Sequence, residues 1–282
     1  MSLSTMVPEI WSSYILGGLE KEAVVLPLAN PRILADASKG DVVHVNALPK
    51  LSASNYINAS GINYSAGTSS DYSFNVDQMK YIGIKISDEE AKRASTSAED
   101  ILARFTRATI NGLIDAADSF LATQYLNFKA LGSGSSPKDA TTGTKALSVL
   151  LEMKKEMDKA SIPSMGRFVV VGPSFANLLL SGTTALSTMN QAILSTGVIG
   201  TVYGLQVRMS NNVGSDTSAD EIIFAGYEDS FGFAHNVSTV EVLRDQDNFG
   251  WLVRGLYVFG GRSLGHSSND IRGVVAYCDT IT

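Results

Sequence analysis

A long and uninterrupted helical pattern between residues 97 and 131 constrains the fold of this 282-residue chain more than any other feature. Thr96 and Glu99 match a capping box, in which each side chain accepts a hydrogen bond from the other residue's backbone N–H. No proline follows until Pro137, and Gly132 ends the pattern. Apolar residues recur between these limits at helical spacing, at Leu102, Phe105, Leu113, Ala116, Ala117, Phe120 and Leu121. The sequence therefore predicts a spine helix of about 35 residues, about 50 Å long.

Two alternating segments precede this helix and predict an extended hairpin. GDVVHVNAL (40–48) and YSFNVDQMKYIGIKI (72–86) alternate apolar and polar side chains, which is typical of strands. Between them lie about 20 residues rich in Ser, Asn, Gly, Ala and Tyr, a polar excursion that is uncommon inside a compact domain. Such a hairpin is marginally stable alone and gains order by lying across another molecule. We therefore expect Lys50, Tyr56 and Tyr64 to be subunit-interface residues.

The N-terminal segment 7–20 predicts a short helix that begins at Pro8 and ends at Gly17-Gly18. So short a helix is marginal alone and must dock onto another surface. Two docking partners remain open, its own domain or a neighbouring subunit. Its apolar stripe comprises Ile10, Trp11, Tyr14 and Ile15, of which Trp11 and Tyr14 are expected at a subunit interface.

The remainder of the chain predicts a second, mixed lobe. The turn-rich stretch 133–144 is the best candidate for a domain boundary. A helix follows over residues 144–160, with Ala146, Leu150, Met153 and Met157 on one face. RFVVVGP (167–173) predicts a buried strand, and a helix begins at Pro173. Further strands are expected in VYGLQVRMS, EIIFAGY, TVEVLRD, WLVRGLYVFGG and DIRGVVAYC. The fold class is therefore α+β, with a long-helix layer, a second lobe and an extended hairpin.

The composition excludes several classes of protein. With 22 basic and 28 acidic residues spread along the chain, the formal charge is −6, which argues against a sequence-reading nucleic-acid-binding protein. The single cysteine, Cys278, allows neither an intrachain disulfide nor a cysteine-based zinc site. We expect neither a secretory signal nor a membrane span, because no sufficiently long apolar run occurs.

Four patterns that resemble chemical sites are incomplete. Gly260 to Gly265 lacks the following helix that a dinucleotide site needs. Gly172-Pro173-Ser174 completes neither a phosphate loop nor a nucleophile elbow. Residues 245–256 begin like a calcium loop but fail at two ligand positions. The histidines show no metal or Ser–His spacing; they are His44, His235 and His266. We therefore predict no catalytic, cofactor or metal site, and a protein that is not an enzyme.

The order of these elements resembles the major capsid proteins of tailed bacteriophages, which share the Hong Kong 97-like fold. GDVVHVNAL and FNVDQMKYIGIKISDEEA resemble the two strands of that family's extended hairpin (the E-loop) and the start of its peripheral domain. SIPSMGRFVVVGPSFANLLL resembles the strand–helix unit of the axial domain, and GVIGTVYGLQVRMSNNV (197–213) resembles a glycine-rich turn, strand and Ser-Asn-Asn segment. The resemblance covers essentially the full length.

The resemblance implies the domain boundaries. They are an N-terminal arm at 1–34, the E-loop at 35–86, a peripheral domain at 87–142 and 236–270 with its spine helix at about 97–131, and an axial domain at 143–235 and 271–282. Axial loops around 181–200 would lie near the capsomer symmetry axis. Met189 and Gln191 are therefore expected interface residues.

The function implied by the resemblance is that of a major capsid protein, which self-assembles into the icosahedral head of a tailed double-stranded DNA phage. It implies hexamers and pentamers of the chain itself, scaffolding and portal proteins as partners, and weak non-specific contact with packaged DNA. No membrane partner or cofactor is implied. The expected location is the virion, after assembly in the host bacterial cytoplasm.

Two other functions remain open from the sequence. A cellular, encapsulin-like compartment would share the fold, and a soluble α/β enzyme with an unrecognised site is a third hypothesis. Some family members also begin with a scaffolding extension that is later removed, whereas here the arm begins almost at Met1. Either a separate scaffolding protein is used or the chain is already mature.

Overall fold

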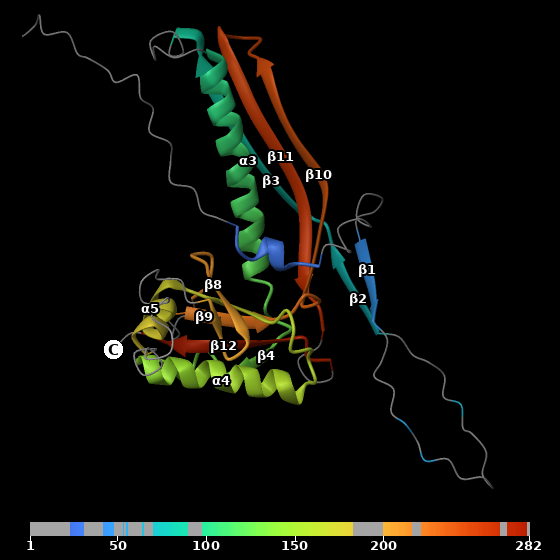
Figure 1. The fold of residues 1–282 in the computed structure, drawn as a ribbon. Coiled ribbons are helices and arrows are strands. Elements are labelled where there is room, and N and C mark those ends of the chain that lie inside the picture. The colour runs from blue at the N-terminus through green and yellow to red at the C-terminus, as the bar shows by residue number, and fades with distance from the viewer. Residues whose placement is uncertain are drawn as a thin grey trace, which may run out of the picture.

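The structure is a computed structural model that describes residues 23–30, 42–47, 53, 55, 64, 70–89, 98–182, 200–215, 221–265 and 270–280. These residues form two lobes and a two-stranded hairpin (Figure 1). We call the elongated part the long lobe and the part around the larger sheet the compact lobe. Among residues 23–30, which precede the hairpin, Leu26–Leu28 form the short 3-10 helix η2. The expected helix at 7–20 and the capping box at Thr96 and Glu99 lie outside the residues whose side chains are described.

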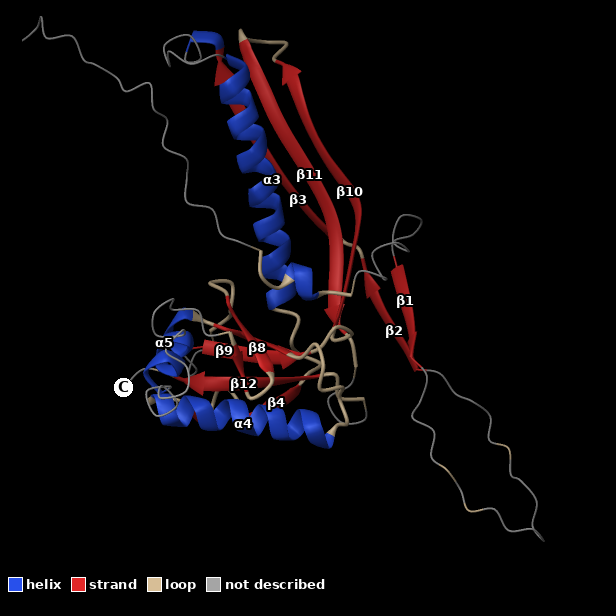
Figure 2. Ribbon diagram, in the orientation of Figure 1, coloured by secondary structure: helices blue, strands red, loops and turns tan. Residues whose placement is uncertain are grey.

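The long lobe consists of one helix on one face of a three-stranded antiparallel sheet (Figure 2). The helix is α3 (Ala98–Ala122), and the sheet order is β10-β11-β3. The strands are β3 (Gln78–Ser87), β10 (Phe231–Arg244) and β11 (Gly250–Ser263). Strand β11 lies in the centre, so β3 and β10 form the two edges.

Helix α3 packs closely on β11 because a glycine faces it. A Cβ atom on Gly255 would lie 2.8 Å from Cγ2 of Thr109 and 2.9 Å from Cδ1 of Leu113. Leu113, Ala117 and Leu121 are buried at this contact. The apolar spacing in the sequence therefore predicted this part of the buried face. Phe105 of the same pattern is exposed instead.

The predicted end of the spine helix at residue 131 was wrong. Helix α3 has 25 residues and ends at Ala122, which makes it about 38 Å long. A turn follows, in which Leu126 is exposed while Phe128 is buried against Phe231. Residues 129–131 then form a strand in the compact lobe. Strand pairing and burial of Phe128 outweigh the local helical pattern, a tertiary effect that propensity cannot anticipate.

The compact lobe is a seven-stranded mixed sheet with two helices, α4 (Gly143–Lys159) and α5 (Pro173–Gly182). Its sheet order is β4-β12-β9-β6-β8-β7, and β5 also pairs with β12. The strands are β4 (Lys129–Leu131), β5 (Lys138–Asp139), β6 (Phe168–Val171), β7 (Thr201–Val202), β8 (Leu205–Met209), β9 (Glu221–Gly226) and β12 (Gly273–Asp279).

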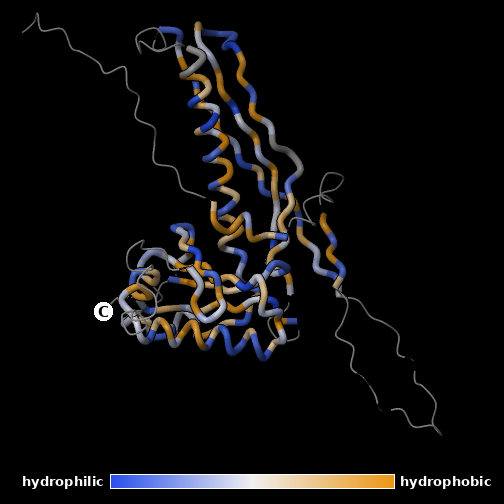
Figure 3. Tube along the Cα trace, in the orientation of Figure 1, coloured by the Kyte–Doolittle hydropathy of each residue, from blue (hydrophilic) through white to orange (hydrophobic). Residues whose placement is uncertain are grey.

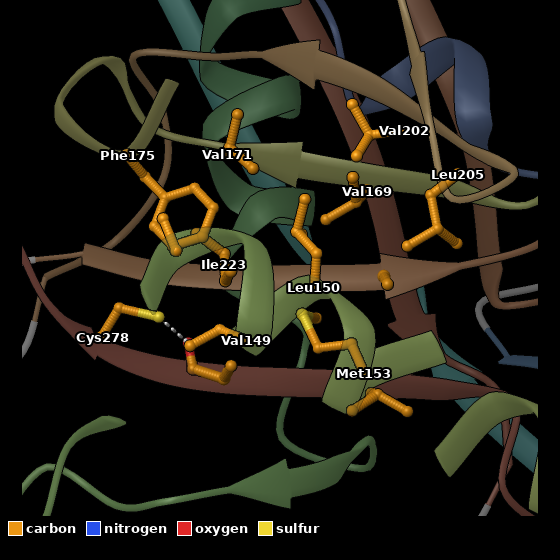
Figure 4. Packing of buried hydrophobic residues seen from close by; sticks show 14 of the residues in the cluster. Val149, Leu150, Met153, Val169, Val171, Phe175, Val202, Leu205, Ile223 and Cys278 are labelled. Atoms are coloured by element: carbon orange, nitrogen blue, oxygen red, sulfur yellow. Dashed lines mark hydrogen bonds between the residues drawn. The ribbon is translucent and has the colours of Figure 1, made fainter. Parts of the chain in front are cut away.

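The core of the compact lobe lies between its sheet and α4 with α5 (Figure 4). Leu150 and Met153 of α4 meet Val169, Val171 and Ile223 of the central strands there. Hydrophobic and hydrophilic residues alternate along α4, as expected for a helix with one solvated face (Figure 3). The start of α4 and the end of α5 approach each other closely at two glycines, Gly143 and Gly182.

The opposite face of the same sheet joins the two lobes. Phe168 and Phe224 of the compact lobe surround Phe231, at ring-centroid distances of 6.5 and 5.6 Å. Phe231 begins β10 of the long lobe, and Leu121 near the end of α3 belongs to the same buried cluster. The lobes therefore share an aromatic core.

The hairpin is shorter than predicted because its second strand is divided. Strand β1 (Val42–Ala47) pairs antiparallel with β2 (Ser70–Asn75), whereas β3 pairs with β11 of the long lobe. The expected E-loop boundary at residue 86 is thus corrected to about residue 76. The peripheral boundary at 142 also differs, because β4 and β5 pair with β12 in the compact lobe. Periodicity locates strands but does not identify their pairing partners.

The α+β fold class is confirmed. No helix in the described part of the chain combines the length and apolar character that crossing a bilayer requires.

Candidate functional site

The predicted interface residues fall largely outside the described ranges. Tyr64 is described and is 90% exposed. Nothing is described for the other six, which are Trp11, Tyr14, Lys50, Tyr56, Met189 and Gln191. Their roles stay predictions. The candidate site is therefore built from the surfaces on and around the hairpin.

The base of the hairpin is held on the long lobe by an apolar contact. Val43 of β1 and Phe74 of β2 point to the same side and pack with Val76, Ala234 and Val258. The end of β2 passes close to the central strand β11 at a glycine, Gly260. A Cβ atom on Gly260 would lie 2.1 Å from the backbone oxygen of Asn75.

A polar contact ties the same base to the chain just before β12. The Tyr72 hydroxyl donates to Oδ2 of Asp270 at 2.8 Å, and Nε of Arg272 donates to that oxygen at 2.9 Å. The Arg272 guanidinium also lies 5.6 Å from the centre of the Tyr72 ring. Partial burial, and then the hydrogen bond to Asp270, raise the pKa of Tyr72. We call these three residues the latch.

The long-lobe sheet has an outer face, opposite α3, that carries exposed apolar side chains. Tyr81 and Leu256 are cross-strand partners on this face, and Tyr81 is 81% exposed. Met79 on the same face of β3 is 70% exposed. An ion pair between Arg254 and Glu241 borders the apolar residues. A contiguous exposed apolar surface of this kind is typical of an interaction surface.

Ion pairs flank the turn between β10 and β11 at the far end of the long lobe. Arg244 makes a bidentate ion pair with Asp88 and lies 5.0 Å from the centre of the Trp251 ring. Lys85 pairs with Asp245 at 2.6 Å, which lowers the pKa of that carboxyl group. In the calcium-loop-like sequence, residues 245–249 therefore connect β10 to β11, and residues 250–256 belong to β11.

A buried carboxylate joins three segments where the lobes meet. Asp118 of α3 is fully buried, and its Oδ1 accepts hydrogen bonds from the backbone N–H groups of Val25 and Leu26, both at 2.8 Å. Its Oδ2 accepts a hydrogen bond from the Asn212 side chain at 2.9 Å. The N-terminal segment, the spine helix and the compact lobe therefore meet at one side chain.

Comparison with known proteins identifies the family. A model of the family described as phage capsid protein matches residues 72–276. The chain belongs to the phage capsid protein family. It is 30% identical to a solved chain from Mycobacterium phage Che8, over 95% of this chain and 96% of that one, with a TM-score of 0.79. No curated protein matches the sequence.

More distant solved structures share the fold of this capsid protein. The capsid structure of the Cyanophage P-SCSP1u is 13% identical, covers 99% of this chain and 95% of that chain, and has a TM-score of 0.75. A chain from Gordonia phage Cozz is 14% identical, with coverages of 98% and 92% and a TM-score of 0.70. The predicted Hong Kong 97-like fold and the role of major capsid protein are confirmed. The role is structural, in self-association into a shell, and its location is the virion.

The chemical candidates of the sequence have structural roles in this capsid protein. The Glu221 carboxylate accepts hydrogen bonds from the backbone N–H groups of Ser174 and Phe175, so the Gly172-Pro173-Ser174 turn carries a helix cap and not a phosphate. Burial raises the pKa of the Cys278 thiol to about 12, which leaves it a poor nucleophile. Within the described ranges, no three His, Cys, Asp or Glu side chains gather into a metal-binding group.

Sequence reasoning missed the outer face, the latch and Asp118. The alternation in YIGIKI does place Tyr81 opposite the isoleucines, so an exposed tyrosine could have been anticipated. Its partner Leu256 could not, because β3 and β11 are far apart in the sequence and nothing local indicates their pairing.

Proposed function

We propose that this capsid protein forms hexamers and pentamers that close into an icosahedral head, with the hairpin of one subunit lying on the outer face of a neighbour's long lobe. The observation that carries this proposal is that one subunit contains two elements that are each incompletely packed. One is a two-stranded hairpin, which is marginally stable alone. The other is an exposed apolar face on a sheet.

The energetics favour covering that face in an assembly. Fully burying a large apolar side chain contributes about 1.5–3 kcal/mol. Tyr81 and Met79 gain little of this in the isolated subunit because they are 81% and 70% exposed, while Leu256, at 41%, gains part of it. Each subunit offers one hairpin and one such face, so the contact is heterologous and closes into rings by rotation.

The remaining partners follow from the same role. We infer that scaffolding and portal proteins take part in assembly, which occurs in the host bacterial cytoplasm. We also infer that the shell contacts packaged double-stranded DNA weakly and without sequence preference, since the chain has a formal charge of −6. No catalytic step belongs to this proposal, and the chain acts as a structural subunit.

The outer face provides the test. We expect a double substitution, Tyr81→Ser with Leu256→Ser, to leave a folded subunit that forms few or no closed shells. Both side chains are exposed, so the free energy of unfolding should change by less than about 1 kcal/mol. Shells are counted by electron microscopy, and folding is checked by thermal unfolding.

Leu151→Ser is the matched control, because Leu151 is also exposed but lies on α4 of the compact lobe. This variant should assemble normally. Shells of the double variant that equal the wild type in yield and size would refute the proposed role of the outer face.

A further inference from the structure

We propose that Asp270 is a positioning residue for assembly, which fixes the direction in which the hairpin leaves the subunit. The inference rests on the proposed function, because a fixed direction matters only if the hairpin reaches a neighbour. It concerns Asp270 together with its latch partners, Tyr72 and Arg272.

The apolar seat of the hairpin base and the latch differ in how strongly they depend on direction. The contact of Val43 and Phe74 with Val258 is apolar, and apolar burial is almost non-directional. The latch is directional, because a hydrogen bond weakens steeply as its angle departs from linearity. The apolar contact, with a hydrogen bond from Arg262 to the backbone oxygen of Ser73, therefore holds the hairpin on the long lobe, while the latch fixes its angle relative to the compact lobe.

Asp270 is itself held in place by contacts of its side chain and its backbone. Both donors, the Tyr72 hydroxyl and Nε of Arg272, converge on the same oxygen atom of Asp270. The backbone of Asp270 lies close to Gly265, whose φ is +101°, and a Cβ atom on Gly265 would lie 2.5 Å from the backbone oxygen of Asp270. The backbone oxygen of Arg272 accepts a hydrogen bond from the Ser230 hydroxyl.

The latch residues Asp270 and Arg272 lie directly before a strand of the compact lobe. Arg272 is followed directly by β12, which pairs with β9 in the sheet of the compact lobe. Tyr72 lies on β2 of the hairpin, 198 residues before Asp270. The latch therefore connects the assembly hairpin to the compact lobe, in addition to its apolar seat on the long lobe. The direction of the hairpin is then set jointly by both lobes.

The test uses the full chain with Tyr72→Phe, Asp270→Asn and the double variant. Tyr72→Phe keeps the ring but removes the donor, and Asp270→Asn removes the charge with little change in size. We expect amide hydrogen exchange of β1 and β2 to become at least tenfold faster, with exchange in α4 unchanged. We also expect at least a fivefold loss of closed shells, replaced by open or misshapen particles. The double variant should be no worse than the more affected single variant, because both act on one contact.

Tyr277→Phe is the matched control, since the Tyr277 ring packs edge-on against Tyr125 in the compact lobe. It should leave hairpin exchange and shell yield unchanged. Wild-type hairpin exchange in both latch variants, or wild-type shells from both, would overturn the proposal. A wild-type chain that formed no shell would instead contradict the proposed function, while the exchange rates would still test the latch.

Discussion

At the scale of single residues, the molecule depends on buried carboxylates that accept hydrogen bonds from distant segments. Asp118 is the clearest example, because it accepts from Val25, Leu26 and Asn212 while fully buried. A buried carboxylate is costly unless it is well hydrogen-bonded, and these donors offset the cost of burying Asp118. Removing the carboxylate would in turn leave those donors unpaired.

Asp118→Ala should therefore lower the free energy of unfolding by about 3 kcal/mol, the order expected when buried donors lose a charged acceptor. Urea denaturation of the isolated subunit measures this. Asp115→Ala is the control, because Asp115 accepts only the Asn212 amide, at 3.0 Å, among the contacts described for it. Equal and small effects of the two substitutions would contradict the role assigned to Asp118.

Glu156 gives the residue-scale prediction for pH. Hydrogen bonds from Lys129 and then Lys159 lower its pKa from 4.5 to about 2. A lowered folded-state pKa means that the stabilising contribution is complete above about pH 4.5 and is lost as the pH falls toward about 2. Glu156→Gln should therefore be less stable than the wild type near neutral pH, with the difference shrinking across that acidic range.

Thermal unfolding at a series of pH values measures this difference. Glu152→Gln is the control, because the Glu152 carboxylate, which pairs with Lys138, is much more exposed than that of Glu156. A gap between Glu156→Gln and the wild type that stayed constant down to about pH 2 would show that the charge of Glu156 is not responsible.

Local pattern predicted residues well where burial follows from one element alone. Ala146, Leu150, Met153 and Met157 were expected on one face of a helix, and all four are fully buried. Asp118 and Asp270 carried no such signal, because the donors they accept from lie 93 and 198 residues away in the sequence. Long-range hydrogen bonds leave no periodicity to read.

At the scale of elements, strands were easier to locate than to pair. The segment 72–86 does form strands, but Val76 and Asp77 separate β2 in the hairpin from β3 in the long lobe. Gly260 marks this division, since β11 can be crossed closely only where it lacks a side chain. Gly260 and Gly261 both lie inside β11.

Gly260→Ala should therefore displace the hairpin base. The added methyl group would meet the backbone of Asn75 and Val76 at 2.1 and 2.7 Å, and backbone cannot give way as a flexible side chain can. We expect a lower thermal unfolding midpoint and faster amide exchange in β1 and β2. Gly83→Ala is the control, because nothing lies within 4 Å of a Cβ atom there. A Gly260→Ala variant as stable and protected as Gly83→Ala would contradict this account of the crossing.

At the scale of the whole molecule, the order of the hairpin, helix and lobes was predictable from the sequence, but the contacts that join them were not. The predicted order of hairpin, spine helix and second lobe agrees with the structure. The joints depend on contacts between distant segments, such as the shared aromatic core around Phe231. That core gives the subunit a fixed body, from which the hairpin projects (Figure 1).

The central claim is that the hairpin of one subunit covers the outer face of the next. Electron cryo-microscopy of particles assembled from the purified chain tests it most directly. We predict closed shells in which β1 and β2 of each subunit lie across the neighbour's long lobe and bury Tyr81 and Leu256. A chain that remained a 30.0 kDa monomer, or shells in which that face stayed bare, would contradict the account.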